Sequence, residues 1–196
     1  MRAALVLLAI VVSGASTPSS AGAITAVERQ RLVAHLEMTA GWLTDEVSGL
    51  SPKQLAFHPS PDSWSILEVL DHLVVVGPIY WQDLQTALKA PAGRPSLSSD
   101  ADILWYGIDR TSREKAIPSE VPKGEARTLA ALLDSYRRSH ARLLEYARTT
   151  TDDLRAHFVV RQGCDAYQWA LLITTHEQRH VQQIREIKGH PSFPRP

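Results

Sequence analysis

Four segments of the sequence repeat apolar residues at intervals of three and four positions, and no segment shows the apolar and polar alternation of a half-buried strand. These segments cover residues 24–49, 65–89, 128–149 and 165–188. Because an amphipathic helix must bury its apolar stripe against another element, four such helices in one chain favour a bundle. We therefore predict an all-α fold of four long helices.

Two of the predicted helices carry strong start signals. Ser65 is followed three positions later by Glu68, and Asp165 by Gln168, so each pair can satisfy backbone donors at a helix N-terminus as a capping box. The second helix is apolar nearly all round from Ile66 to Trp81. That stretch is expected to be deeply buried.

The connection between the second and third predicted helices covers residues 90–127, which is too long for a hairpin turn. Its length suits a crossover that lets these two helices run in the same direction. The connection contains several prolines: Pro91, Pro95, Pro118 and Pro122. A short helix is expected between Asp100 and Lys115.

Composition narrows the class of protein. The chain has 196 residues, 44% of them hydrophobic, which is typical of one soluble domain with a proper core. Lysine and arginine together number 21 and are balanced by 21 aspartate and glutamate residues. With no net charge and no basic stripe, neither nucleic acid nor an anionic membrane is expected as a partner.

The first 23 residues read as a secretory signal peptide. Met1 and Arg2 precede the apolar run AALVLLAIVV, and the segment ends in the small residues Ala21, Gly22 and Ala23. The apolar run is too short to span a bilayer. We expect cleavage after Ala23, leaving residues 24–196 as one exported domain, periplasmic or extracellular and free of the membrane. An uncleaved anchor or a mis-assigned start codon is the alternative.

A single cysteine, Cys164, rules out an intramolecular disulfide. It lies just ahead of the fourth predicted helix, and helix N-termini lower the pKa of a thiol. A reactive thiol at this position is therefore kept as an alternative hypothesis. Nothing beside Cys164 in the sequence reads as a base dedicated to it.

The stretch THEQRH, residues 175–180, matches the H-E-x-x-H pattern of zinc proteases. His176 and His180 would lie about 40° apart on the core-facing stripe of the fourth helix. Burying two unpaired imidazoles costs about 1–3 kcal/mol each, so a shared metal ion is expected. The protease form fails because Gln183 and Glu186 stand where the metzincin pattern requires Gly and His.

A third ligand is therefore expected upstream, and His72 is the natural candidate. His72 lies in DHLVVV near the middle of the second predicted helix, at about the same depth as His176 in the fourth. Metal sites in bundles form from side chains on facing helices. The alternative, a core histidine bonded to a backbone carbonyl, stays open.

Two stretches resemble one known family. PDSWSILEVLDHL at 61–73 and HEQRHVQQI at 176–184 are similar to the W-S-x-x-E-x-x-x-H and H-x-x-x-H motifs of the DinB-like (DNA-damage-inducible) four-helix bundles. The resemblance implies an up-down-down-up bundle. It also implies a site of His72, His176 and His180 that binds nickel, zinc or a similar divalent ion. Relatives include metal-dependent hydrolases and thiol-dependent transferases or isomerases, and many form homodimers.

Three neutral imidazoles leave an open position on the ion, where the pKa of a bound water falls to about 7. We therefore predict a hydrolase that acts on a small-molecule substrate. Glu177, by adjacency, and His140, on the core face of the third helix, are the candidates for a catalytic base. His140 could instead be a fourth ligand or a partner of one, or simply pack in the core.

Three other functions stay open. A thiol-dependent transferase or isomerase would need cytosolic thiols, from which a signal peptide would separate the protein. A metal-binding stress or sensor protein would have the same ligands without turnover. A purely structural bundle would use its histidines for packing alone.

The signal peptide gives the first testable prediction. Mass spectrometry of the exported protein should find Ile24 as the first residue, because cleavage is expected after Ala23. A cytosolic protein that retains Met1 would contradict export and would make thiol transfer the leading hypothesis.

Overall fold

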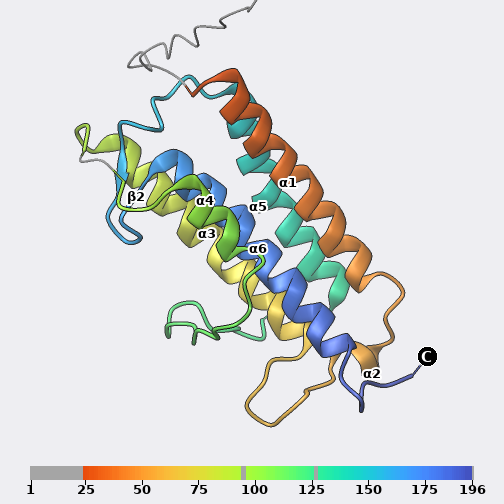
Figure 1. Ribbon diagram of the computed structural model, residues 1–196. Helices are drawn as coiled ribbons and strands as arrows, with labels where there is room; N and C mark the ends of the chain where they lie inside the picture. Colours follow the sequence, from red (N-terminus) through yellow and green to blue (C-terminus); the bar gives the residue numbers. More distant parts are fainter. Residues whose placement is uncertain (1–23, 94–95, 126–127, 196) are drawn as a thin grey trace, which may run out of the picture.

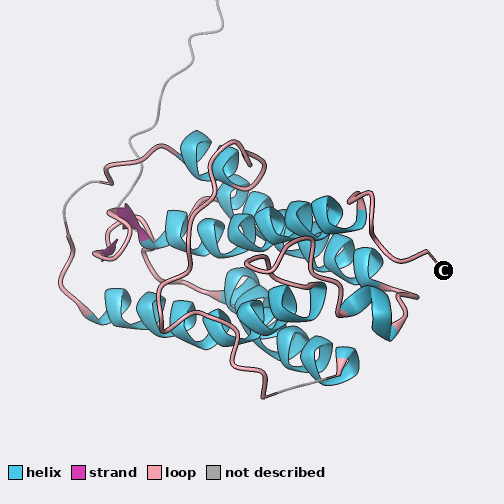
Figure 2. Cartoon of the chain, turned by 90° about the horizontal axis from the view of Figure 1, so that it is seen from below, coloured by secondary structure: helices cyan, strands magenta, loops and turns pink. Residues whose placement is uncertain are grey.

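The computed structural model describes residues 24–93, 96–125 and 128–195, and confirms the predicted all-α four-helix bundle. Figures 1 and 2 show the long helices packed side by side, with loops and short elements around them. The long helices are α1 (Ala26–Val47), α3 (Ile66–Lys89), α5 (Leu129–Thr149) and α6 (Ala166–Lys188). The short elements are α2 (Pro52–Leu55), α4 (Asp100–Tyr106), β1 (Phe158–Val159) and β2 (Cys164–Asp165). The expected signal peptide, residues 1–23, lies outside the described residues.

Contacts near the helix ends show that α1 and α6 run in the same direction. Close to their starts, the Tyr167 hydroxyl donates a hydrogen bond to the carbonyl of Glu28, over 3.3 Å. Close to their ends, the Lys188 ammonium lies 2.7 Å from the carboxylate of Glu46. The order around the bundle is α1, α6, α3, α5, with each helix packed against the next and α5 closing back onto α1.

The other two helices run opposite to this pair. The Arg29 guanidinium, near the start of α1, donates to the carbonyl of Ala147 near the end of α5. The Trp169 indole, near the start of α6, donates to the carbonyl of Tyr80 in the second half of α3. Thus α3 and α5 are parallel, and the bundle is up-down-down-up, as the long crossover predicted.

The largest departure from the sequence analysis concerns burial. Every residue of α6 from Ala166 to Val181 is buried, whereas α3, which was expected to be buried all round, has Val75 half-buried and Pro78 exposed. The reason is that α4 and the crossover cover the outer face of α6. A helix rich in polar residues therefore occupies the most enclosed position in the fold.

Smaller differences lie in the connections. The strands β1 and β2 form an antiparallel hairpin of two pairs, which the sequence analysis did not expect. The helix expected within residues 100–115 ends at Tyr106, where the chain comes close to α6 at Gly107. Both predicted capping boxes, at Ser65 and at Asp165, are present.

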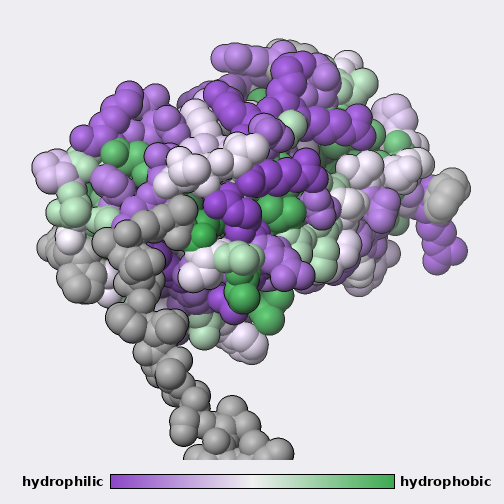
Figure 3. Space-filling view, turned by 90° about the horizontal axis from the view of Figure 1, so that it is seen from above, coloured by the Kyte–Doolittle hydropathy of each residue, from purple (hydrophilic) through white to green (hydrophobic). Residues whose placement is uncertain are grey.

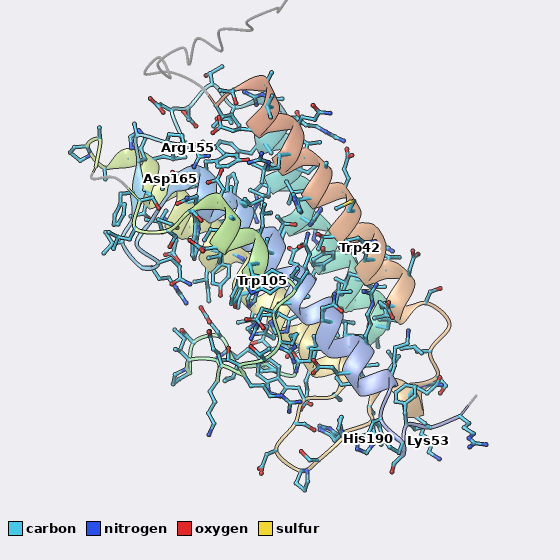
Figure 4. All side chains as sticks on the ribbon, viewed as in Figure 1. Trp42, Lys53, Trp105, Arg155, Asp165 and His190 are labelled. Atoms are coloured by element: carbon cyan, nitrogen blue, oxygen red, sulfur yellow. The ribbon has the colours of Figure 1, made fainter. Side chains whose placement is uncertain are left out.

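An ion-pair cluster fixes the end of the bundle where α1 and α6 begin. The Arg155 guanidinium contacts the carboxylates of Glu28, Asp100 and Asp165 at 2.7 to 2.9 Å, and also covers the ring of Tyr167. Figure 4 shows Arg155 and Asp165 side by side at this end. One side chain thus joins α1, α4 and the start of α6.

The outer surface is mostly hydrophilic. In Figure 3, polar residues cover much of the face seen from above, with smaller apolar areas between them. Within the described ranges, no helix combines the length and the apolarity that a bilayer span requires.

The contact at Gly107 gives a prediction about stability. A methyl group added there would lie 2.8 Å from Oε1 of Gln178 and 3.0 Å from Cβ of Thr175, so Gly107→Ala should lower the free energy of unfolding by about 1–3 kcal/mol. Gly41, on the exposed face of α1, meets nothing within 4 Å. Gly41→Ala is the matched control and should raise the free energy of unfolding by about 0.5–1 kcal/mol. Urea denaturation of both variants checks this, and equal effects would contradict the close approach.

Candidate metal centre

The predicted ligands meet between α3 and α6. Nε2 of His176 lies 3.3 Å from Nε2 of His72 and 3.1 Å from Nε2 of His180. All three side chains are buried, and one nitrogen from each lies within 4.8 Å of the others. Nitrogens at about 2.0–2.1 Å around a tetrahedral ion are about 3.3 Å apart, so the spacing fits one shared ion.

Hydrogen bonds at the far side of two rings set their tautomers. Nδ1 of His72 donates to the carbonyl of Glu120 over 2.6 Å, and Nδ1 of His180 donates to Oε1 of Gln183 over 2.8 Å. The proton of each ring is therefore on Nδ1, and the lone pair of each Nε2 points toward His176. Such outer partners orient the histidines of metal sites. A divalent ion would satisfy all the facing lone pairs together.

Electrostatics keep these rings uncharged. Burial lowers the pKa of all three histidines, and the pKa of His176 falls to about 3 through burial, the neighbouring His72 and the positive charges of Arg179 and Arg161. An imidazole is neutral above its pKa, so these rings are neutral at physiological pH. Neutral imidazole is the form that binds a metal ion.

The three histidines lie on the wall of an open cavity of about 1470 Å³. Trp64 and Tyr80 add an aromatic wall: the Trp64 ring lies 4.9 Å from the ring of His72, and the Tyr80 ring lies 5.4 Å from that of His176. Much of the remaining wall comes from the loop at residues 59–63, residues 106–121, the β1–β2 turn and the end of α6. The cavity is large enough for a small molecule to reach the histidines.

Two arginines beside the centre were missed by the sequence analysis. Arg179 is buried and donates to the carbonyls of Tyr106, Asp109 and Ser112, which holds the crossover over α6. Arg161, in the β1–β2 turn, pairs with the carboxylate of Glu120. The spacing of Arg179, three residues after His176, could have placed it on the same helix face. The sequence did not point to Glu120, because the crossover has no repeating pattern of apolar residues that would place its side chains.

Glu177 and His140 meet each other on a different side of α6. The Glu177 carboxylate accepts a hydrogen bond from the Tyr136 hydroxyl at 2.9 Å and lies 3.2 Å from Nδ1 of His140. Burial lowers the pKa of His140, but the hydrogen bond and charge of Glu177 outweigh burial and raise it. Both residues line a separate cavity of about 20 Å³, and neither lines the cavity in front of the three histidines. Their catalytic role stays a prediction.

Cys164 does not have the surroundings of a reactive thiol. Its side chain is fully buried, and burial, with the nearby charge of Asp165, raises the pKa of the thiol to about 12. The thiolate, which is the nucleophile, therefore does not form near neutral pH. The effect of the helix N-terminus on this thiol is outweighed by its burial.

Comparison with known proteins agrees with this arrangement. The sequence model that describes the DinB superfamily matches residues 25–184 of this chain. The chain belongs to the DinB superfamily. It is 28% identical over 148 residues to the uncharacterized protein YuaE of Bacillus subtilis (strain 168), an alignment that covers 74% of this chain and 89% of YuaE.

A solved structure has the same fold. YfiT from Bacillus subtilis superposes with a TM-score of 0.59 at 18% sequence identity, covering 88% of this chain and 91% of YfiT. YfiT is described as a probable metal-dependent hydrolase with an unusual four-helix bundle topology. At this identity the likeness shows the shared fold.

The centre gives a prediction about metal content. His176→Ala should abolish stoichiometric binding of zinc or nickel, because Nε2 of His176 is the nitrogen that both other rings face. Helical circular dichroism should remain largely intact. His58→Ala is the matched control, since this exposed histidine lies in the loop before α3 and should leave the metal content unchanged. Elemental analysis of untagged protein checks this, and wild-type metal content in His176→Ala would contradict the assignment.

Proposed function

We propose that this member of the DinB superfamily is a metal-dependent hydrolase of a small molecule. The observation that carries the proposal is the convergence of three neutral imidazole nitrogens on the wall of an open cavity. The description of YfiT as a probable metal-dependent hydrolase supports the same reaction class.

His72, His176 and His180 would hold the ion, with zinc or nickel as the proposed metal. A divalent ion bound by three neutral ligands acts as a Lewis acid and lowers the pKa of a bound water to about 7. The carbonyl of Glu120 and the amide of Gln183 keep two of the rings in the required tautomer. The chain thus supplies a preorganised ligand set with an accessible side.

Glu177 and His140 are proposed to contribute indirectly. Their contacts with each other and with Tyr136 join α6 to α5, which fixes the rotation of α6 about its own axis. Because His176 and His180 lie on another face of α6, that rotation decides whether their rings point at His72. In this role the two residues position the ligands.

Export, which residues 1–23 support, favours hydrolysis over thiol transfer. A periplasmic or extracellular protein is separated from the cytosolic pool of low-molecular-weight thiols, while water is always available. We therefore propose hydrolysis as the main activity of the exported domain.

Activity measurements test this proposal. Purified, metal-loaded protein should hydrolyse members of an ester, amide and lactone panel, at a rate that rises with pH through about 7. A chelator should remove the activity, and added metal should restore it. His72→Ala should bind metal more weakly and lose most of the rate, because two ligands from α6 would remain without the one from α3.

One result would replace hydrolysis with thiol transfer. If the fully loaded protein hydrolyses nothing in the panel, yet conjugates an electrophile once a low-molecular-weight thiol is added, the hydrolase proposal is wrong. A protein that binds metal and shows neither reaction would instead be a metal-binding protein without turnover.

A further inference from the structure

Tyr80 has an unused hydrogen-bonding group beside the metal centre. Its side chain is 6% exposed and lines the cavity, with its ring edge-on to His176. Its hydroxyl makes no hydrogen bond with any residue in the described part of the chain. The oxygen is not among the polar atoms that are buried without a partner, so it is open to the cavity and can donate to a ligand that enters there.

A second tyrosine, Tyr106, lines the same cavity, and each phenol ring is covered by a guanidinium. Arg161 lies 5.2 Å from the ring centre of Tyr80, and Arg179 lies 4.9 Å from that of Tyr106. Burial raises the pKa of both hydroxyls, so both keep their protons at neutral pH. Protonated phenols beside positive charges are hydrogen-bond donors toward an anionic oxygen.

The charges on this wall are unevenly neutralised. Glu120 pairs with Arg161, and Glu186 pairs with Arg110, so these carboxylates are already compensated. The partners of Arg179 are backbone carbonyls, which carry no net charge, and within the described residues it forms no ion pair. The carboxylates of Glu186 and Asp109 act on the charge of Arg179 only from beyond ion-pair distance. An anion that binds in contact with Arg179 would stabilise this buried cation further.

We propose that the Tyr80 hydroxyl, Tyr106 and Arg179 form an oxyanion-binding subsite beside the three histidines. The ligand is the carboxylate or phosphate oxygen of a small molecule whose reactive group faces the metal centre. This inference rests on the proposed function and specifies its substrate class: small anionic compounds rather than neutral or cationic ones.

Titration calorimetry on the metal-loaded full chain tests the subsite without requiring turnover. The probes are succinate, inorganic phosphate and succinamide, which is the uncharged counterpart of succinate. We expect succinate or phosphate to bind at least tenfold more tightly than succinamide, and the tighter of the two identifies the preferred oxyanion. Tyr80→Phe should weaken that binding about tenfold, because one hydrogen bond to a charged group is lost.

Arg179→Gln should lower the affinity for the same anion by tenfold or more. This variant also removes the hydrogen bonds that hold the crossover against α6. Tyr80→Phe keeps the ring and its packing and is therefore the decisive variant. Tyr146→Phe is the matched control, since the Tyr146 hydroxyl bonds to Asp152 outside the cavity and its loss should leave anion binding unchanged.

Two results would overturn the subsite. Equal affinity for the anion in wild type and Tyr80→Phe would mean that the Tyr80 hydroxyl does not bind the anion, which removes the group on which the subsite depends. Equal affinity for succinate and succinamide would mean that charge is not recognised. Because binding is measured without turnover, anion binding in a protein that hydrolyses nothing would leave the subsite standing and remove only the hydrolase proposal.

Discussion

The structure depends on the burial of a helix that is rich in polar side chains. Every residue of α6 from Ala166 to Val181 is buried, and each buried polar group left without a partner costs about 1–3 kcal/mol. The surrounding elements supply the partners, each on a different side of α6. The pairs are Thr174 and Gln178 with α1, Glu177 with α5, His176 with α3, Arg179 with the crossover, and Gln168 with the loop before α4. These requirements determine how the bundle can assemble around its central helix.

Most of the buried polar groups of α6 find their partners within the chain. The three histidines are the place where a bound ion would complete the pairing. On the α1 side, Thr174 lies 3.0 Å from the hydroxyl of Thr39, and Gln178 donates to the same hydroxyl over 2.9 Å. On the α3 side, the lone pairs of His72 and His180 both face His176. A single proton on His176 can be shared with one of them at a time, whereas one divalent ion satisfies all three rings. The requirement that every buried polar group have a partner therefore also indicates a metal ion between the three histidines.

The helices and the pair His176 and His180 could be predicted because periodicity, capping boxes and the i, i+4 spacing are local signals. The helix directions followed from the length of the crossover, and His72 from its depth in the second helix and from the family resemblance. The depth of α6 was missed because its polar residues lower its apparent hydrophobicity, and their partners lie far away in the chain. Glu120 illustrates the limit: it supports His72 across 48 positions, from a crossover without periodicity. Tyr80 could have been found by extending the stripe of His72 by two turns, but its unpaired hydroxyl is a property of the folded core.

The H-E-x-x-H pattern has a different meaning here because the helix is covered on every side except where His176 and His180 line the cavity. Glu177 follows His176 by one position and therefore points about 100° away around α6. In an active site on an open cleft, that direction can still reach solvent and substrate. Here it reaches α5, where Tyr136 and His140 bind the carboxylate. The same two histidines keep the capacity to hold a metal ion, while the glutamate between them joins two helices. The surroundings of the helix, more than the five-residue pattern, decide which side chains can act on a substrate.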